Sequence, residues 1–210
     1  MEIKNIEVYG FRRALHAMRN PMNSWNKSDS AFMGTEWGEI IAPDVPVIGI
    51  NDMSLINSLI KAGPSHRKFL RQIMVWWDIK APRYVWQELD TYKVATVRNS
   101  CSTMHKLGYR NIGPDDFQDG EVMSSVLDEL NRLAQIYRGG GHDHKVLRLM
   151  KQILPEGFLQ EATYTFSYET GMSMYLLRRA HRLSEWSGPG GICETIKALP
   201  YMEQFLEAIT

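Results

Sequence analysis

Small hydrogen-bonding side chains are crowded into one short stretch near the middle of this chain. Between positions 99 and 105 the stretch contains Asn99, Ser100, Cys101, Ser102, Thr103 and His105. Hydroxyl, amide and thiol groups in such a cluster either satisfy the backbone of a turn or line a pocket that grips a polar ligand. Only the second alternative predicts a binding site.

A second set of candidate residues lies in the sequence LLRRAHR at 176–182. Arg178 and His181 are three residues apart, and this spacing puts two side chains on one face of a helix. Arg179 and Arg182 add positive charge nearby. Because arginine offers a fixed fork of donors that stays charged, this face suits an anion or a carbonyl oxygen. The alternative is a basic face that only meets solvent.

Three other segments contain residue types that occur in binding or metal sites. His66 stands beside Arg67 and Lys68, which gives a phosphate-facing role a physical basis. His142 and His144 form a His-x-His pair, but a metal site needs three or four ligands and no matching carboxylate or cysteine pair is nearby. The glycine-rich sequence SGPGG at 187–191 lacks the preceding strand that a phosphate-binding loop requires. We therefore expect an exposed loop at the histidine pair and a break between helices at the glycines.

Hydrophobic periodicity predicts an α+β fold in which helices outnumber strands. Strands are expected at residues 2–9, 71–79 and 158–166. Helices are expected at 11–20, 54–63, 83–93, 121–137, 145–154 and 167–182, with a last helix after Gly191. Ser167 is the expected cap of the helix over 167–182, with Thr170 as a second candidate.

The length predicts a single domain over residues 1–210, with a helical part at 117–153. Residues 21–52 read as a long loop, which is unusual inside a compact domain and points to a functional or assembly element.

Composition narrows the class of function. The chain has 24 basic and 24 acidic residues, so it lacks the excess positive charge typical of nucleic-acid binding. Its longest strongly apolar run, residues 73–77, is far too short to span a membrane. Two cysteines, Cys101 and Cys193, are too few for a disulfide framework. Together with the lack of a recognisable secretory signal, they predict a reduced, cytoplasmic setting.

The order and spacing of these segments resemble the flavin-dependent thymidylate synthases. As in that family, a segment with Gly and His (GPSHRKF) precedes a strand (IMVWWDI) and an Ala-Pro-led helix (KAPRYVW). The family signature Arg-His-Arg-x-x-Ser-x-Asn-Glu-x-Ser-x-Arg-Tyr falls on TYKVATVRNSCSTM, residues 91–104, which we call the signature segment. Residues 154–186 are similar in layout to the family's Leu-Pro, strand, and helix ending in Leu-x-Leu-Arg. The resemblance covers residues 50–205.

This resemblance implies a fold and a set of ligands. The expected fold is that of the thymidylate-synthase-complementing proteins, a twisted, mainly antiparallel sheet packed with helices, plus a helical extension. Members use FAD, a reduced folate as methylene donor and dUMP, in a homotetramer with sites at subunit interfaces. They pass a methylene group and a hydride to C5 of the uracil without an obligatory cysteine nucleophile. Such chemistry depends on charged groups that the protein holds in fixed positions.

By position, the resemblance also implies roles for individual residues. Arg178 matches the arginine that polarises the pyrimidine, and His66 matches the histidine near folate and flavin, so both are the expected catalytic residues. The expected substrate-binding residues are Lys93, Thr96, Arg98, Asn99, Cys101, Ser102 and Glu88. The expected cofactor-binding residues are His66, Thr91, Tyr92, Ser167 and Ser173.

The signature is degenerate in this chain. Thr91, Tyr92 and Lys93 replace Arg-His-Arg, and Thr103 replaces a phosphate-binding arginine. Glu169 stands where the family has an arginine, and a carboxylate there would weaken phosphate binding. Two alternatives to a divergent synthase therefore stay open. One is a non-catalytic homologue that binds a nucleotide or acts as a scaffold, and the other is a pocket in which Glu169 pairs with a cationic group of a different substrate.

Overall fold

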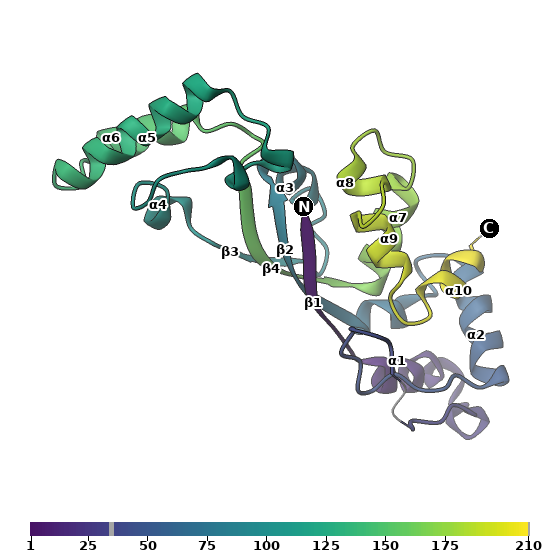
Figure 1. The fold of residues 1–210 in the computed structure, drawn as a ribbon. Helices are drawn as coiled ribbons and strands as arrows, with labels where there is room; N and C mark the ends of the chain where they lie inside the picture. The colour runs from purple at the N-terminus through teal and green to yellow at the C-terminus, as the bar shows by residue number, and fades with distance from the viewer. Residues whose placement is uncertain (34–35, 210) are drawn as a thin grey trace. The chain divides into compact units, whose positions relative to one another are not determined.

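The fold is that of a computed structural model, which describes residues 1–33 and 36–209 (Figure 1). The strands are β1 (Glu2–Tyr9), β2 (Met74–Pro82), β3 (Val97–Ser100) and β4 (Leu159–Ser167). The helices are α1 (Phe11–Met18), α2 (Ile50–Lys61), α3 (Arg83–Leu89), α4 (Thr103–Lys106), α5 (Ser124–Gly139), α6 (His144–Ile153), α7 (Tyr168–Arg178), α8 (Ser184–Ser187), α9 (Ile192–Lys197) and α10 (Met202–Glu207). Short 3-10 turns are η1 (Asn20–Met22), η2 (Trp25–Lys27), η3 (Lys68–Gln72), η4 (Pro114–Asp116) and η5 (Gln118–Gly120).

Over the described residues, the strands form an antiparallel sheet in the order β1-β2-β4-β3. On the central strand β2, Val75, Trp77 and Ile79 are fully buried, which explains why its apolar pattern was readable in the sequence. The edge strand β3 is polar and mostly exposed, and hydrophobic periodicity did not predict it. The expected α+β class is confirmed.

The internal contacts of the chain divide it into two compact units. The first unit contains Met1–Glu2, Ile79–Thr91 and Asn99–Thr163. The second contains Ile3–Asp78, Tyr92–Arg98 and Tyr164–Thr210. The signature segment therefore contributes its middle residues to the second unit and its two ends to the first. The expectation of one domain over residues 1–210 stays a prediction.

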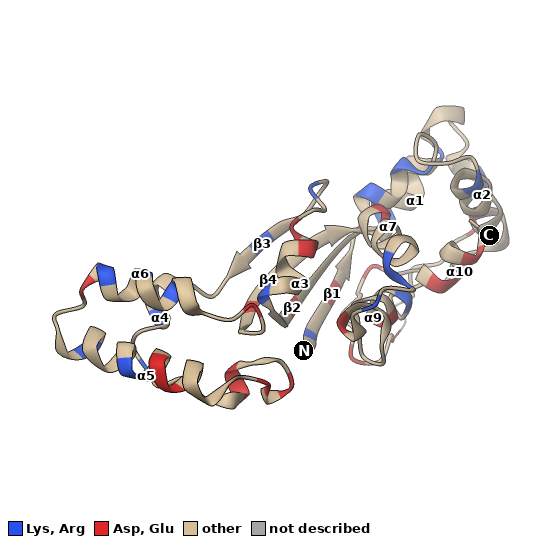
Figure 2. Cartoon of the chain, turned by 90° about the horizontal axis from the view of Figure 1, so that it is seen from above, with Lys and Arg blue, Asp and Glu red and all other residues tan. Residues whose placement is uncertain are grey.

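A helical hairpin supplies the core of the first unit. Helices α5 and α6 lie side by side (Figure 1). Their buried side chains are Leu130, Leu133, Ala134, Tyr137, Leu147 and Met150. The four on α5 are spaced three, four and seven residues apart, which places them on one face of the helix. Lys and Arg residues are spread along α6, whereas acidic residues gather before α5 and in its first half (Figure 2).

Aromatic packing supplies the core of the second unit. Trp77 and Phe166 pack with their ring centroids 4.6 Å apart. Tyr168 makes edge contacts with Phe11 at 5.4 Å and Phe205 at 6.4 Å, and its hydroxyl donates to a backbone carbonyl, that of Pro200, at 3.0 Å. Because the Tyr168 ring is fully buried, this hydrogen bond avoids the penalty of an unpaired polar group.

The long loop expected at residues 21–52 is anchored at its C-terminal end by a buried carboxylate. Helix α2 already begins at Ile50, so the loop is shorter than predicted. Asp52 accepts hydrogen bonds from Ser28 Oγ at 2.7 Å, Ser30 Oγ at 2.6 Å and Arg19 Nε at 2.7 Å. Burial alone would raise the pKa of Asp52, but these hydrogen bonds and the Arg19 charge lower it overall. The residues near the loop are thus tied to α1 and α2.

Two predicted helices, α3 and α7, end four residues earlier than expected. Helix α3 ends at Leu89 rather than residue 93, because Thr91 Oγ1 turns back to the Glu88 carbonyl at 2.7 Å. Helix α7 ends at Arg178 rather than residue 182, since His181 N bonds the Arg178 carbonyl at 2.9 Å in a turn. No helix in the described ranges is long and apolar enough to cross a membrane.

Candidate functional site

Helix α7 positions the first candidate group, which lies in the second unit. Ser167 caps its N-terminus, as predicted, by accepting a hydrogen bond from Thr170 N at 3.3 Å. Ser167 is fully buried, so its hydroxyl serves the start of the helix. A Cβ on Gly171 would lie 2.8 Å from the Phe166 ring, so the helix sits against the core at a distance that only glycine permits. Its last residue is Arg178.

The middle of the signature segment is fixed against α7. Thr170 Oγ1 donates to the Val94 carbonyl at 2.8 Å, and Thr96 Oγ1 donates to the Tyr92 carbonyl at 2.6 Å. The hydroxyl of Thr96, an expected substrate contact, is therefore engaged within its own loop. These two bonds hold Tyr92 in the position from which it reaches the end of α7.

Arg178 lies in a cluster of polar and aromatic side chains. Its Nε donates to the Tyr92 hydroxyl at 3.2 Å, and its Nη1 lies 2.9 Å from His181 Nε2. A guanidinium has no acceptor, so the histidine nitrogen accepts in this contact. The guanidinium carbon also lies 5.2 Å from the ring centre of the fully buried Trp186. Three side chains thus fix the plane of one permanent cation, an arrangement suited to binding a carbonyl or an anion.

The buried thiol of Cys193 lies within the electrostatic influence of Arg178. Burial raises the pKa of the Cys193 thiol to about 11, although the Arg178 charge opposes the shift. The thiol stays protonated near neutral pH and is a poor nucleophile. This cluster can therefore act through the fixed positive charge of Arg178 and not through a nucleophilic thiol.

Glu169 has a partner within the protein. Its carboxylate accepts from Arg67 Nε at 2.9 Å, and both side chains are mostly buried, at 15% and 12% exposure. This contact accounts for the carboxylate that replaces a family arginine: its charge is met by Arg67 and not by a substrate cation. Because Arg67 pairs with Glu169, its charge is neutralised and does not add to the basic cluster expected around His66. The side chain of His66 itself is exposed.

The other expected residues of the second unit do not join this cluster closely. Lys93 and Arg98 are exposed on the signature segment, and Ser173 is half-buried on α7. Their position leaves them accessible to a ligand.

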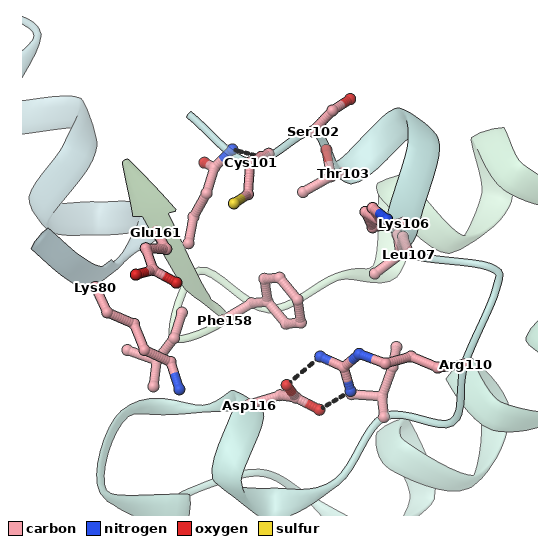
Figure 3. Close-up of a pocket in the computed structure, with 13 residues that line it drawn as sticks. Lys80, Cys101, Ser102, Thr103, Lys106, Leu107, Arg110, Asp116, Phe158 and Glu161 are labelled. Carbon is pink, nitrogen blue, oxygen red and sulfur yellow. Dashed lines mark hydrogen bonds and ion pairs between the residues drawn. The ribbon is translucent and has the colours of Figure 1, made fainter. Parts of the chain in front are cut away.

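A cavity of about 240 Å³ forms the second candidate group, entirely within the first unit (Figure 3). Its walls include two expected substrate-binding residues, Cys101 and Ser102, together with Thr103. The residues that line it are Lys80, Cys101, Ser102, Thr103, Lys106, Leu107, Arg110, Ile112, Asp116, Phe158, Leu159, Gln160 and Glu161. These three side chains of the polar stretch at 99–105 therefore line a cavity, and ligand binding by the stretch stays a prediction.

Backbone pairing brings the cavity wall together. Cys101 N donates to the Glu161 carbonyl at 2.8 Å, and Gln160 Nε2 donates to the Cys101 carbonyl at 2.7 Å. These bonds attach the end of β3 to β4 and turn the thiol of Cys101 toward the cavity (Figure 3). Asn99 is exposed on β3, and Glu88 and Thr91 lie outside the cavity lining.

A paired arginine and carboxylate close one side of the cavity. Arg110 donates to both oxygens of Asp116, with Nη1 at 2.6 Å from Oδ2, and Gly113 N also donates to Asp116 at 2.9 Å. Burial alone would raise the pKa of Asp116, but these hydrogen bonds and the charges of Arg110 and Lys80 lower it overall. The charges of Arg110 and Asp116 cancel, so this pair adds no net charge to the cavity wall.

Sequence reasoning missed Lys80 and Lys106. Both flank recognised motifs: Lys80 precedes the Ala-Pro pair, and Lys106 follows the crowded polar stretch by one residue. Basic residues next to these two motifs were the available signal. Of the expected site residues, the structure brings Tyr92 to Arg178 and places the consecutive residues Cys101 and Ser102 on one cavity wall.

Comparisons with known proteins agree on the fold. No protein-family model and no curated protein matches the sequence. Among solved structures, the chain is similar to the flavin-dependent thymidylate synthase ThyX from Helicobacter pylori complexed with FAD and dUMP, with 18% identity and a TM-score of 0.67 over 98% of this chain and 97% of that chain. A second structure of thymidylate synthase X from Helicobacter pylori with FAD and dUMP gives 17% identity and a TM-score of 0.69 over 100% of both chains. The fold expected from the signature segment is confirmed.

Proposed function

We propose that this protein is a divergent, cytoplasmic flavin-dependent thymidylate synthase that binds FAD and a pyrimidine nucleotide of the dUMP type. The proposed reaction is reductive methylation at C5 of the uracil, with a reduced folate as methylene donor. The observation that carries the proposal is the fixed placement of Arg178 by Tyr92, His181 and Trp186. Two solved structures with this fold hold FAD and dUMP, which supports the choice of ligands.

Arg178 has the properties that uracil chemistry at C5 requires. A guanidinium that donates to the pyrimidine stabilises negative charge on the ring, and a donor already held in place needs no reorganisation during the reaction. The contacts from Tyr92 and His181 provide that fixed placement. The role of Arg178 in this proposal is to bind and polarise the pyrimidine.

The residues present fit FAD through aromatic and hydroxyl contacts. Tyr92 and Trp186 form an aromatic pair with centroids 6.2 Å apart, and His66 and Thr91 are exposed and accessible. We assign cofactor contacts to these accessible residues and to Ser173, while Ser167 stays a capping residue. When bound, FAD supplies the hydride that completes the methyl group. Lys93 and Arg98 supply positive charge for phosphate oxygens, with Lys93 as a point charge and not a fork.

Spectroscopy and calorimetry test the proposal. Purified protein incubated with FAD and then desalted is expected to keep the flavin absorbance bands, and dUMP is expected to bind in calorimetry. Expression in a thymidine-auxotrophic strain is expected to restore growth. A colourless protein that takes up neither FAD nor dUMP would rule the proposal out. Light scattering tests the homotetramer that the family resemblance implies.

A second candidate is a non-catalytic homologue that binds a nucleotide. The pairing of Arg67 with Glu169 favours it, because the pair neutralises charge where the family carries an arginine. The replacement of signature arginines by Thr91 and Thr103 points the same way. Tight dUMP binding together with failure to rescue the auxotroph, despite good expression, would support this candidate over the synthase.

A further inference from the structure

The imidazole ring of His181 has a hydrogen-bond donor at each of its two nitrogens. Arg178 Nη1 lies 2.9 Å from Nε2, and the backbone N–H of Leu183 approaches Nδ1 at 3.3 Å. A neutral imidazole has only one accepting nitrogen, because the other one carries a proton. The two donors therefore compete for a single lone pair. The charged guanidinium, at the shorter distance, is the stronger competitor.

The position of the His181 ring is fixed by its surroundings. The backbone N–H of His181 donates to the Arg178 carbonyl at 2.9 Å, and its own carbonyl accepts from Ser187 Oγ at 2.8 Å. The ring also makes an edge contact with Trp186, with centroids 6.2 Å apart. Arginine, in contrast, has a long side chain with many rotamers. When the contact between the two side chains breaks, the guanidinium is thus the group with more freedom to move.

Protonation of His181 is incompatible with the contact to Arg178. An imidazolium carries a proton on each nitrogen, so it can accept a hydrogen bond from neither Arg178 nor Leu183. It also places a second positive charge at hydrogen-bond distance from the guanidinium, where like charges repel. The contact therefore requires the neutral ring. Histidine is the side chain whose charge ordinarily changes between pH 5 and 8.

Other charged or titratable groups on the surrounding elements add to this balance. Arg179 and Arg182 are exposed and disfavour a further positive charge, whereas the buried carboxylate of Glu185 on α8 favours one. Arg178 is in direct contact with the ring, so its repulsion acts over a short distance. The remaining groups on these elements are Tyr92 and Lys93 on the signature segment, and Cys193, Glu194 and Lys197 on α9.

We propose that His181 is a positioning residue that holds Arg178 only while its ring is neutral and protonated on Nδ1. Mild acid then releases the guanidinium from its fixed position and weakens binding of the pyrimidine. The inference rests on the proposed function for its ligand and deepens it, because it makes binding through Arg178 sensitive to pH. The tautomer of His181 is a property of the protein alone.

Nitrogen-15 NMR of the histidine rings tests the tautomer without any ligand. In wild-type protein at pH 8, the His181 ring is expected to carry its proton on Nδ1, because Nε2 accepts from Arg178. In the R178M variant, which has no donor at this position, the proton is expected on Nε2, because Nδ1 then accepts from Leu183 N. The signal missing from the H181Q spectrum identifies His181. A wild-type ring protonated on Nε2 overturns the inference.

Calorimetry with dUMP at pH 7.5 and pH 5.5 tests the consequence for binding. Glutamine offers an accepting oxygen that does not titrate, so the H181Q variant is expected to bind dUMP as wild type does at pH 7.5. On going to pH 5.5, the affinity of wild type is expected to fall about tenfold more than that of H181Q, because one charged hydrogen bond is lost. Ionisation of the dUMP phosphate affects both proteins and cancels in this comparison.

Two further variants complete the test. H181L, which has no acceptor, is expected to bind dUMP weakly at both pH values. H144Q makes the glutamine change at an exposed histidine on α6 and is expected to keep the pH dependence of wild type. Equal pH dependence in wild type and H181Q overturns the inference even when dUMP binds well. If wild type binds no dUMP at either pH, the proposed function fails, and the tautomers of wild type and R178M decide the inference.

Discussion

Two cations of this protein illustrate two ways of preparing a polar site. Arg178, in the second unit, is held by Tyr92 and His181 and faces the ring of Trp186. Lys106, in the first unit, is exposed on the cavity wall and has no such partner among the described residues. A fixed guanidinium suits a charge that develops during a reaction, whereas a mobile ammonium suits a ligand charge that is already present.

The difference shows how the signature segment has diverged. Its middle residues are joined to α7 through the Val94 carbonyl, Thr96 holds the backbone of Tyr92, and Tyr92 in turn accepts a hydrogen bond from Arg178. Its last residues have exchanged a guanidinium for the hydroxyl of Thr103 and leave positive charge to a neighbouring lysine.

The largest expected effect comes from removing the fixed cation. The R178A variant is expected to lower kcat for C5 methylation about 100-fold or more, as loss of a single preorganised donor does in other enzymes. R178K is expected to restore little, because an ammonium cannot keep both contacts. The neighbouring exposed Arg179 provides the control variant, R179A. An R178A enzyme with wild-type turnover would remove the distinction between the two cations.

The Y92F variant tests whether the fixed placement of Arg178 matters. Loss of one hydrogen bond to a charged group is expected to lower kcat about tenfold while KM changes little. The matched control is the Y109F variant, which makes the same change at an exposed tyrosine of the first unit. A change confined to KM would instead assign Tyr92 to ligand binding.

The D116N variant tests the neutral wall of the cavity. The pair with Arg110 is expected to contribute about 1 kcal/mol to the free energy of unfolding at neutral pH, a modest value because Arg110 is 57% exposed. The folded-state pKa of Asp116 lies below its usual value of 3.8, so this contribution is present above that pH and is lost as the pH falls through the lowered pKa. Urea unfolding at several pH values measures it, with D115N as control.

The outcome for D116N can also contradict the account. If the stability difference between D116N and wild type grows as the pH falls below 4, the sign of the linkage is wrong.

The smallest expected effect is that of E169Q. Removing the carboxylate frees Arg67 from its ion pair, so dUMP binding is expected to tighten about threefold if Arg67 lies within electrostatic reach of the ligand. Calorimetry in low salt measures the change, and E194Q on α9 is the control. Weaker dUMP binding by E169Q would show that the carboxylate itself contacts the nucleotide.

Much of the fold was predictable because periodicity reports burial. The α5 face carrying Leu130, Leu133 and Tyr137 was readable from its spacing, and Ser167 was readable as a cap. Strand β3 was not, since an exposed edge strand needs only backbone pairing and has no apolar pattern. The end of α7 also escaped prediction, because a turn at His181 and not a helix breaker ends it.

The candidate site was less predictable, because its partners are distant in sequence. Glu169 and Arg67 are 102 positions apart, and nothing local indicates that they pair. Likewise, Lys80 and Asp116 meet at one cavity only after folding. The family resemblance supplied positions such as Arg178, but the side chains that hold it came from the structure.

The most direct test of the central claim is tritium release from C5 of labelled dUMP, measured with reduced FAD and a methylene-carrying folate. The account predicts that wild-type protein releases tritium to water. The rate of release by the R178A variant is expected to be lower by a factor of about 100 or more. Wild-type protein that binds both FAD and dUMP yet releases no tritium would contradict the proposed synthase activity.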